Sequence, residues 1–164
     1  MTTARQAARS TDRQQLARAL GDAMQRYQRS VQAFDDAVGR RLGLGPADLR
    51  CLDWLVDGPK SAGQLSTATG LRPAATTALI DRLASRGLVR RKRSDTDRRT
   101  VLVEMTDLGQ AQTWEVYGPL VQAGQPMLDE LSREQLALMA DYLRRITALT
   151  DQHRQLLVDR PPEA

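Results

Sequence analysis

The sequence is poor in the residues that build disulfides, metal sites and many catalytic centres. Its 164 residues include one cysteine, Cys51, and one histidine, His153, so no internal disulfide and no cluster of His and Cys ligands can form within one chain. No apolar run approaches the roughly 18 residues that a membrane-spanning helix needs. The polar N-terminus lacks the apolar segment of a signal peptide. We therefore expect a cytoplasmic protein without membrane segment, metal or cofactor.

Motifs typical of enzymes are also missing. The sequence contains no G-x-S-x-G, P-loop, H-E-x-x-H or dinucleotide-binding glycine pattern, and each of these patterns positions a particular catalytic or cofactor-binding group. Carboxylates are present, but no spacing sets a pair of them apart. We therefore predict that the chain is not an enzyme and has no catalytic residues.

Positive charge is concentrated in the middle of the chain. The formal net charge is +4, yet residues 61–105 hold nine basic and four acidic side chains, whereas residues 106–164 hold five basic and nine acidic ones. A basic segment of this kind is typical of a surface that faces a polyanion. Charge alone favours neither a nucleic-acid-binding surface nor a merely solvated one.

Apolar residues at helical spacing predict a long N-terminal helix that begins near residue 12. The stripe has 4-3-4-3-4 spacing and consists of Leu20, Met24, Tyr27, Val31, Phe34 and Val38. Such spacing places its members on one side of a helix. A helix of this length measures roughly 45 Å, so it either packs along its own core or reaches into a second subunit.

Two short helices separated by a glycine-containing turn follow a helix over 46–56. Ser61 and Gln64 form an S-x-x-Q capping box before the first of them, and Gly70 ends it. Pro73 suits the first turn of the second helix, which we predict to end near Arg86. Two short helices joined in this way are typical of a helix-turn-helix motif.

The second helix of this pair has two different faces. One face consists of Thr76, Leu79, Ile80 and Leu83. The other consists of Ala74, Thr77, Ala78, Asp81 and Ser85, with Arg82 at its edge. Small side chains let a helix lie deep in a groove, although alanine also simply favours helix formation.

After the second helix the period changes to that of strands. Leu88 and Val89 begin a short strand, residues 94–97 are turn-forming, and residues 100–105 are typical of a second strand. Together they predict a β-hairpin with Arg98 and Arg99 at its tip. A hairpin directly after a helix-turn-helix is a wing.

Two further helices complete the predicted structure. Thr106 caps a helix that we expect Gly118 and Pro119 to kink or interrupt. A second S-x-x-Q box at Ser132 starts the last helix, and Pro161 with the next proline ends the structured chain. The apolar stripe of the last helix consists of Leu136, Met139, Leu143, Ile146 and Leu149.

The order of these elements and the residues of 70–109 resemble the MarR family of bacterial and archaeal regulators. The similarity is carried by the runs LIDRL at 79–83, RGLVRR at 86–91, DRR at 97–99 and LVEMT at 102–106, with Gly109. The resemblance implies a mainly α fold with a small β-hairpin wing. It implies the following division: tail 1–11, N-terminal dimerisation helix 12–45, winged helix-turn-helix domain 46–106, C-terminal dimerisation helices 107–158 and tail 159–164.

The resemblance also implies a homodimer that represses transcription from palindromic operators in double-stranded DNA. The helix at 73–86 would enter the major groove, and the wing would reach the minor groove. The candidate DNA-binding residues are Arg72, Ala74, Ala75, Thr76, Thr77, Ala78, Arg82, Arg86, Asp97, Arg98 and Arg99. Arginines position the protein on phosphates, while threonine and alanine methyl groups meet thymine methyls. Few side chains here pair bidentately with bases, so DNA shape should contribute strongly.

One residue of the wing has two alternative roles. In the family, an aspartate of the wing orients an arginine in the minor groove, and the corresponding residues here are Asp97 and Arg99. The alternative for Asp97 is a turn residue that pairs locally.

Many family members release DNA when a small, often aromatic or phenolic, effector binds. Trp54, Trp114 and Tyr117 lie in the segments that the resemblance places around such a pocket, with ordinary core packing as the alternative. For Cys51 a buried, inert thiol is favoured over a peroxide sensor. The alternative function for the whole chain is a helical protein-binding adaptor, against which the basic hairpin argues.

Overall fold

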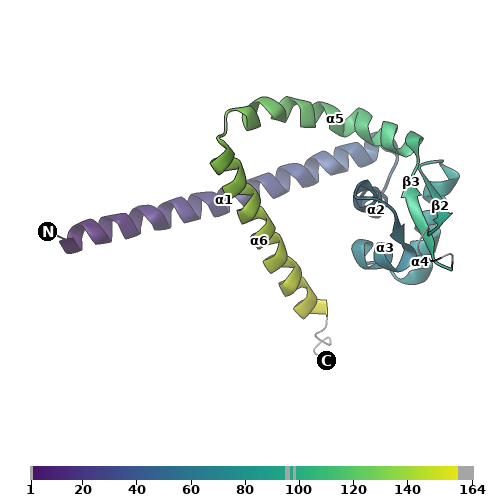
Figure 1. Ribbon diagram of the computed structural model, residues 1–164, viewed down its shortest axis with the longest axis horizontal. Helices are drawn as coiled ribbons and strands as arrows, with labels where there is room; N and C mark the ends of the chain where they lie inside the picture. The colour runs from purple at the N-terminus through teal and green to yellow at the C-terminus, as the bar shows by residue number, and fades with distance from the viewer. Residues whose placement is uncertain (1, 95–96, 98, 159–164) are drawn as a thin grey trace. The chain divides into compact units, whose positions relative to one another are not determined.

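A computed structural model describes residues 2–94, 97 and 99–158. Figure 1 shows a chain made of helices with one small sheet, which confirms the predicted fold class. The elements are α1 (Thr2–Leu42), α2 (Pro46–Val56), β1 (Lys60–Ser61), α3 (Ala62–Thr69), α4 (Pro73–Ser85), β2 (Val89–Arg93), β3 (Val101–Met105), α5 (Asp107–Asp129) and α6 (Arg133–Val158). The chain divides within α5 into two compact units, one ending at Trp114 and one starting at Glu115.

The first helix, α1, is longer than predicted, since it begins at Thr2. Residues 2–11 contain no proline or glycine and include three alanines, so no residue there stops a helix. Residues 2–11 of the predicted flexible tail are therefore helical. At the other end, Gly43 has a φ of 61°, a left-handed conformation that glycine adopts without strain and that ends the helix.

Helices α2, α3 and α4 begin and end close to the predicted residues. The amide of Gln64 donates to Oγ of Ser61 at 3.2 Å, and the amide of Ser61 donates to Oε1 of Gln64 at 2.8 Å, which confirms the capping box. Gly70 then ends α3 with a φ of 71°. Pro73 starts α4 as predicted.

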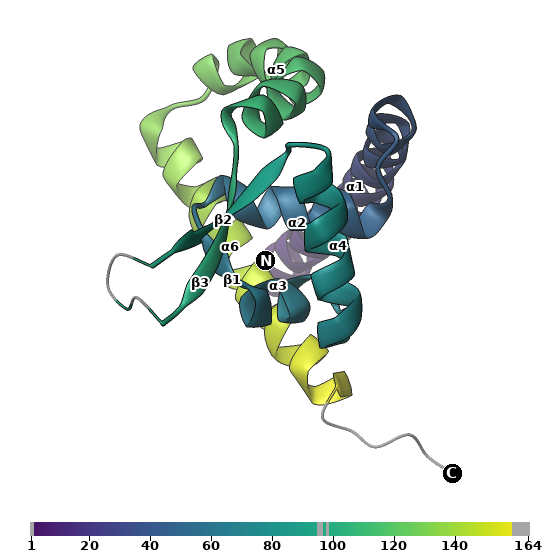
Figure 2. The same cartoon turned by 90° about the vertical axis from the view of Figure 1, so that its right-hand side faces the viewer.

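The core of the first unit lies between these three helices and the sheet, which Figure 2 shows side by side. Its largest fully buried side chains include Leu65, Leu79, Ile80, Leu83, Leu88 and Val103. All four residues of the predicted inward face of α4 are buried. The opposite face of α4 therefore remains available to a partner.

The sheet is antiparallel, with strand order β1-β3-β2. The predicted hairpin of β2 and β3 is present, with Val89 opposite Met105 and Arg93 opposite Val101. Lys60 of β1 pairs with Val103, an addition that the sequence did not indicate. A strand of two residues has no periodicity, and it exists here because β3 offers it a free edge.

Helix α5 is joined to the base of the wing. The hydroxyl of Thr106 donates to the carbonyl of Gly87 at 2.6 Å and accepts from the amide of Gly109 at 3.0 Å, so it caps α5 as predicted. The helix then continues through Pro119 and Pro126. Gly118 and Pro119 therefore do not interrupt the helix. The other predicted outcome, a kink at this point, stays a prediction, since an interior proline loses a hydrogen bond and crowds the preceding turn.

The second unit contains the rest of α5 and the whole of α6. The predicted capping box is confirmed, since the amide of Ser132 donates to Oε1 of Gln135 at 2.7 Å and the amide of Gln135 donates to Oγ of Ser132 at 3.3 Å. None of the described residues of α6 is buried. No helix within the described part of the chain is both long and apolar enough to cross a membrane.

Candidate nucleic-acid interface

Helix α4 presents a face of small side chains to solvent. Ala74, Ala75, Thr77 and Ala78 are all exposed. The hydroxyl of Thr77 donates to the carbonyl of Pro73 at 3.1 Å. Because the hydroxyl proton is used within the helix, this face offers mainly methyl groups to a partner.

Thr76 belongs to the opposite face of α4. Its side chain is 1% exposed, and its hydroxyl donates to the carbonyl of Arg72 at 3.1 Å. The 3.6-residue period of the helix places it with Leu79 and Leu83, in the core. Thr76 is therefore removed from the predicted base contacts.

Two arginines predicted to contact phosphate have partners within the first unit. Nη2 of Arg82 donates to Oδ1 of the buried Asp48 at 2.5 Å. Nη1 and Nη2 of Arg86 donate to the carbonyls of Gly43 at 2.7 Å and Leu42 at 2.6 Å. These carbonyls are at the C-terminal end of α1, where a cation is favoured. Both arginines therefore tie α4 to neighbouring helices, and their contact with DNA stays a prediction.

Asp97 organises the turn of the wing. Its Oδ1 accepts from the amide of Arg99 at 3.0 Å, and its Oδ2 accepts from the hydroxyl of Thr100 at 2.8 Å. These two bonds, the backbone one first, hold the pKa of the Asp97 carboxyl below its ordinary value. Asp97 thus has the local turn role, and it places the backbone of Arg99. Arg98 lies outside the described residues.

Most basic side chains of β2 are paired inside the protein. Nε of Arg90 donates to Oε1 of Glu104 at 2.7 Å, and Nζ of Lys92 lies 3.3 Å from Oε2 of the same carboxylate. The hydrogen bond from Arg90 is the largest cause that lowers the pKa of Glu104. Nη2 of Arg91 donates to Oδ1 of Asp81 at 2.7 Å. The net charge of the segment therefore overstates the cations that are free to meet DNA.

At the start of α4 and in the wing, three exposed arginines have no ion-pair partner among the carboxylates of the described residues. Arg72 precedes α4, Arg93 ends β2, and Arg99 lies in the wing turn. Side chains of this kind can bind phosphate without first breaking an internal pair. Arg93 was not among the predicted contacts. The signal that could have identified it is its position as the last residue of the predicted strand, next to the wing turn, where its side chain is exposed.

The aromatic residues predicted to line an effector pocket are divided between the two units. Trp54 on α2 is 46% exposed and Trp114 is 55% exposed, so neither tryptophan is an ordinary core residue. Tyr117 belongs to the second unit. The effector pocket stays a prediction.

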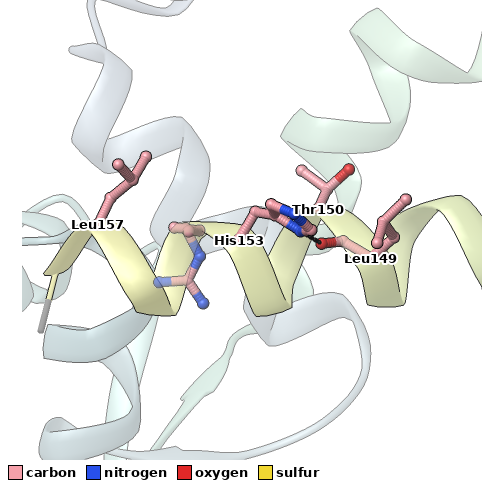
Figure 3. Close-up of a pocket in the computed structure, with 5 residues that line it drawn as sticks. Leu149, Thr150, His153 and Leu157 are labelled. Carbon is pink, nitrogen blue, oxygen red and sulfur yellow. Dashed lines mark hydrogen bonds between the residues drawn. The ribbon is translucent and has the colours of Figure 1, made fainter.

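One hollow lies on α6, away from these aromatics in the sequence (Figure 3). It is lined by Leu149, Thr150, His153, Arg154 and Leu157. Nδ1 of His153 lies 2.9 Å from the carbonyl oxygen of Leu149, so this ring is turned toward its own helix. Because all the lining residues come from one helix, the hollow is open and holds no enclosed ligand site. Within the described residues, no group of His, Cys, Asp and Glu side chains is arranged to hold a metal ion.

Cys51 should be almost inert in the folded protein. It is fully buried in the core, and burial, with the nearby Asp48 carboxylate, raises its pKa to about 12. Because the thiolate is the reactive form, we expect an aromatic disulfide reagent at neutral pH to label the folded protein at least about tenfold more slowly than the chain unfolded in urea. Equal labelling rates for the two forms would contradict this assignment.

The known proteins that this chain resembles in sequence and in structure are transcriptional regulators. The sequence model of the MarR family matches residues 42–100, from the end of α1 to the wing. The HTH-type transcriptional regulator YcgE of Bacillus subtilis is 30% identical over 125 residues, covering 76% of this chain and 81% of that protein. The structure of the transcriptional regulator BldR from Sulfolobus solfataricus is 27% identical, with a TM-score of 0.53, over 80% of this chain and 93% of that one.

A further solved structure, a MepR mutant from a multidrug-resistant S. aureus clinical isolate, shares the fold. It has a TM-score of 0.64 at 14% identity, over 77% of this chain and 94% of that one. The order of helices, the sheet and the wing agree with these similarities. The chain therefore belongs to the MarR family of DNA-binding transcriptional regulators.

Proposed function

We propose that the chain acts as a homodimeric repressor, binds a palindromic operator and leaves it when a small aromatic effector binds. One observation carries the DNA-binding part of this proposal. The exposed methyl-rich face of α4 lies in the same unit as Arg72, Arg93 and Arg99, which have no carboxylate partner among the described residues. Sequence-specific binding of double-stranded DNA needs a helix that fits the major groove and cations that can contact the phosphates, and this unit has both.

Each part of this surface has its own task on DNA. The N-terminal turns of α4 enter the major groove, because these turns contact base edges in helix-turn-helix proteins. Arg72 precedes the first turn and binds a phosphate there. Arg93 and Arg99 extend the contact along the wing to the backbone and the minor groove.

The homodimer is supported by apolar surface that one chain leaves uncovered. On α1, Tyr27 is 71% exposed and Leu20 is 46% exposed, and on α6 Leu143 is 54% exposed. Exposed apolar rows of this length are typical of helices that pack against a partner. Two identical DNA-binding units related by a twofold axis would bind half-sites about one helical turn apart.

The effector part of the proposal rests on the two exposed tryptophans of the first unit, Trp54 and Trp114. A stacking ligand would change the fluorescence of the two exposed tryptophans and release labelled DNA at the same concentrations. If a panel of phenolic compounds does neither, release by an aromatic effector is contradicted, and the DNA-binding part is unaffected.

The central experiment is fluorescence anisotropy with the duplex upstream of the chain's own gene and a scrambled duplex, across a salt series. We expect nanomolar, sequence-dependent binding that weakens steeply as salt increases. Equal and weak binding of both duplexes, repeated with several promoter fragments, would contradict the regulator and favour the helical adaptor.

The methyl-rich face predicts a particular sensitivity to thymine methyl groups. Replacing thymine by uracil in the half-sites keeps the base pairs and removes only these methyls. We expect each contacted methyl to contribute about 0.8 kcal/mol, so affinity should fall roughly fourfold for each. Uracil placed outside the half-sites is the control. Unchanged affinity after substitution of every thymine would show that Ala74, Thr77 and Ala78 do not read them.

A further inference from the structure

The exposed face of α4 carries an acidic side chain, Asp81. It follows Ala74, Thr77 and Ala78 at helical spacing, so it lies on the same face as the small residues proposed to meet DNA. Its side chain is 56% exposed. A carboxylate on this face would repel the phosphates as the helix approaches the duplex.

Arg91 compensates this charge from a different element. Its Nη2 donates to Oδ1 of Asp81 at 2.7 Å, which joins β2 of the wing to α4. A charge-assisted hydrogen bond of this length is among the stronger polar contacts. Its neighbours Arg90 and Lys92 both lie against Glu104, so neither of them replaces Arg91 as the partner of Asp81.

We propose that Arg91 is a positioning residue for DNA binding, which acts by neutralising Asp81 and holding it against the wing. Arg91 then contributes no phosphate contact of its own, because moving it to a phosphate would leave the Asp81 carboxylate uncompensated beside the DNA. This inference rests on the proposed DNA-binding function. It differs from the simple interpretation of the basic segment, in which every arginine of β2 contacts the duplex.

A double-mutant cycle in the full-length protein tests this role, with anisotropy on the operator duplex as the readout. Arg91→Ala is expected to weaken binding about tenfold, since it exposes the Asp81 charge. Adding Asp81→Asn should return the affinity to within about threefold of the wild type. If the double variant binds as weakly as Arg91→Ala, Arg91 is itself a DNA contact and the proposal is overturned.

Arg93 provides the matched control, because it lies on the same strand and has no carboxylate partner among the described residues. Arg93→Ala should lower the salt slope by about one, and Asp81→Asn should not restore its affinity. Arg91→Ala should keep the wild-type slope. A slope reduced by Arg91→Ala as much as by Arg93→Ala would also overturn the proposal.

If Arg91→Ala alone does not fold, the double variant with Arg91→Ala and Asp81→Asn still tests the proposal. Because it removes both charges, it should bind the operator within about threefold of the wild type, and binding more than about tenfold weaker would overturn the proposal. Binding of the scrambled duplex distinguishes a failure of the proposed DNA-binding function from a failure of the role proposed for Arg91. Wild-type protein that binds both duplexes equally would overturn the proposed function and this inference together, whereas a specific wild type without rescue overturns this inference alone.

Discussion

Replacing Gly109 by alanine is expected to destabilise the first unit by about 3 kcal/mol, because the added methyl group has no space. A Cβ at this position would lie 2.2 Å from the carbonyl oxygen of Leu88 and 2.8 Å from Cγ of Met105. The carbonyl cannot simply rotate away, since it accepts from the amide of Thr106 at 3.0 Å. Relief of the clash therefore requires α5 to move away from the base of the wing.

Gly63→Ala is the control for this prediction. Gly63 is also in a helix, but a Cβ there meets only Oγ of Ser61 at 3.9 Å, an ordinary contact. Alanine favours helix by about 1 kcal/mol over glycine, so this change should be neutral or stabilising, and helix propensity would act in the same direction at Gly109. Urea unfolding, followed by circular dichroism and by tryptophan fluorescence, measures both free energies. A Gly109→Ala protein as stable as the wild type would show that α5 is not held against Leu88.

Gly109 also shows which parts of the fold the sequence could predict. The starts of α3 and α6 follow from capping boxes, the start of α4 from Pro73 and the end of α3 from Gly70, because those signals act over a few residues. The motif that contains Gly109 indicated the family, but the reason for the glycine is a contact with Leu88, across the base of the wing. The same holds for β1, since its pairing with β3 is a tertiary interaction.

The sequence predicted the helix-turn-helix and the wing as structural elements better than it predicted the roles of individual arginines. Arg82 pairs with Asp48, which is 34 residues earlier, and Arg86 donates to carbonyls 43 and 44 residues earlier. A sequence pattern that extends over a few residues cannot indicate a partner so far away along the chain. For Thr76, in contrast, the sequence was sufficient, because its helical spacing already placed it on the buried face. Its inclusion among the base contacts therefore came from its chemistry alone.

Arg99→Ala is expected to weaken operator binding by about 1–3 kcal/mol for each wing that is engaged, or roughly 5- to 150-fold. The guanidinium has no carboxylate partner among the described residues, so no internal pair must be broken before it binds DNA. Its backbone is already held by Asp97, whose carboxylate accepts from the Arg99 amide at 3.0 Å. Part of the ordering cost of the contact is therefore met before the DNA arrives.

The pKa of Asp97 decides the conditions under which this turn is intact. Its folded-state pKa is lowered from 3.8, so the stabilisation of the turn is complete above 3.8 and is lost as the pH falls through the lowered value. Assays between pH 6 and pH 8 therefore all measure the ordered turn. A difference between Arg99→Ala and wild type should not change across that range.

Comparing Arg90→Ala with Arg99→Ala shows whether binding depends on the position of Arg99 or only on the total positive charge of the wing. Both variants remove one positive charge from the wing, but Arg90 is paired with Glu104 at 2.7 Å, and Lys92 remains beside the same carboxylate when Arg90 is removed. We expect Arg90→Ala to weaken binding by less than about threefold at fixed salt. Equal losses for Arg90→Ala and Arg99→Ala would mean that the wing acts as diffuse positive charge. A loss confined to Arg99→Ala would mean that the turn held by Asp97 places one guanidinium at a defined position on the duplex.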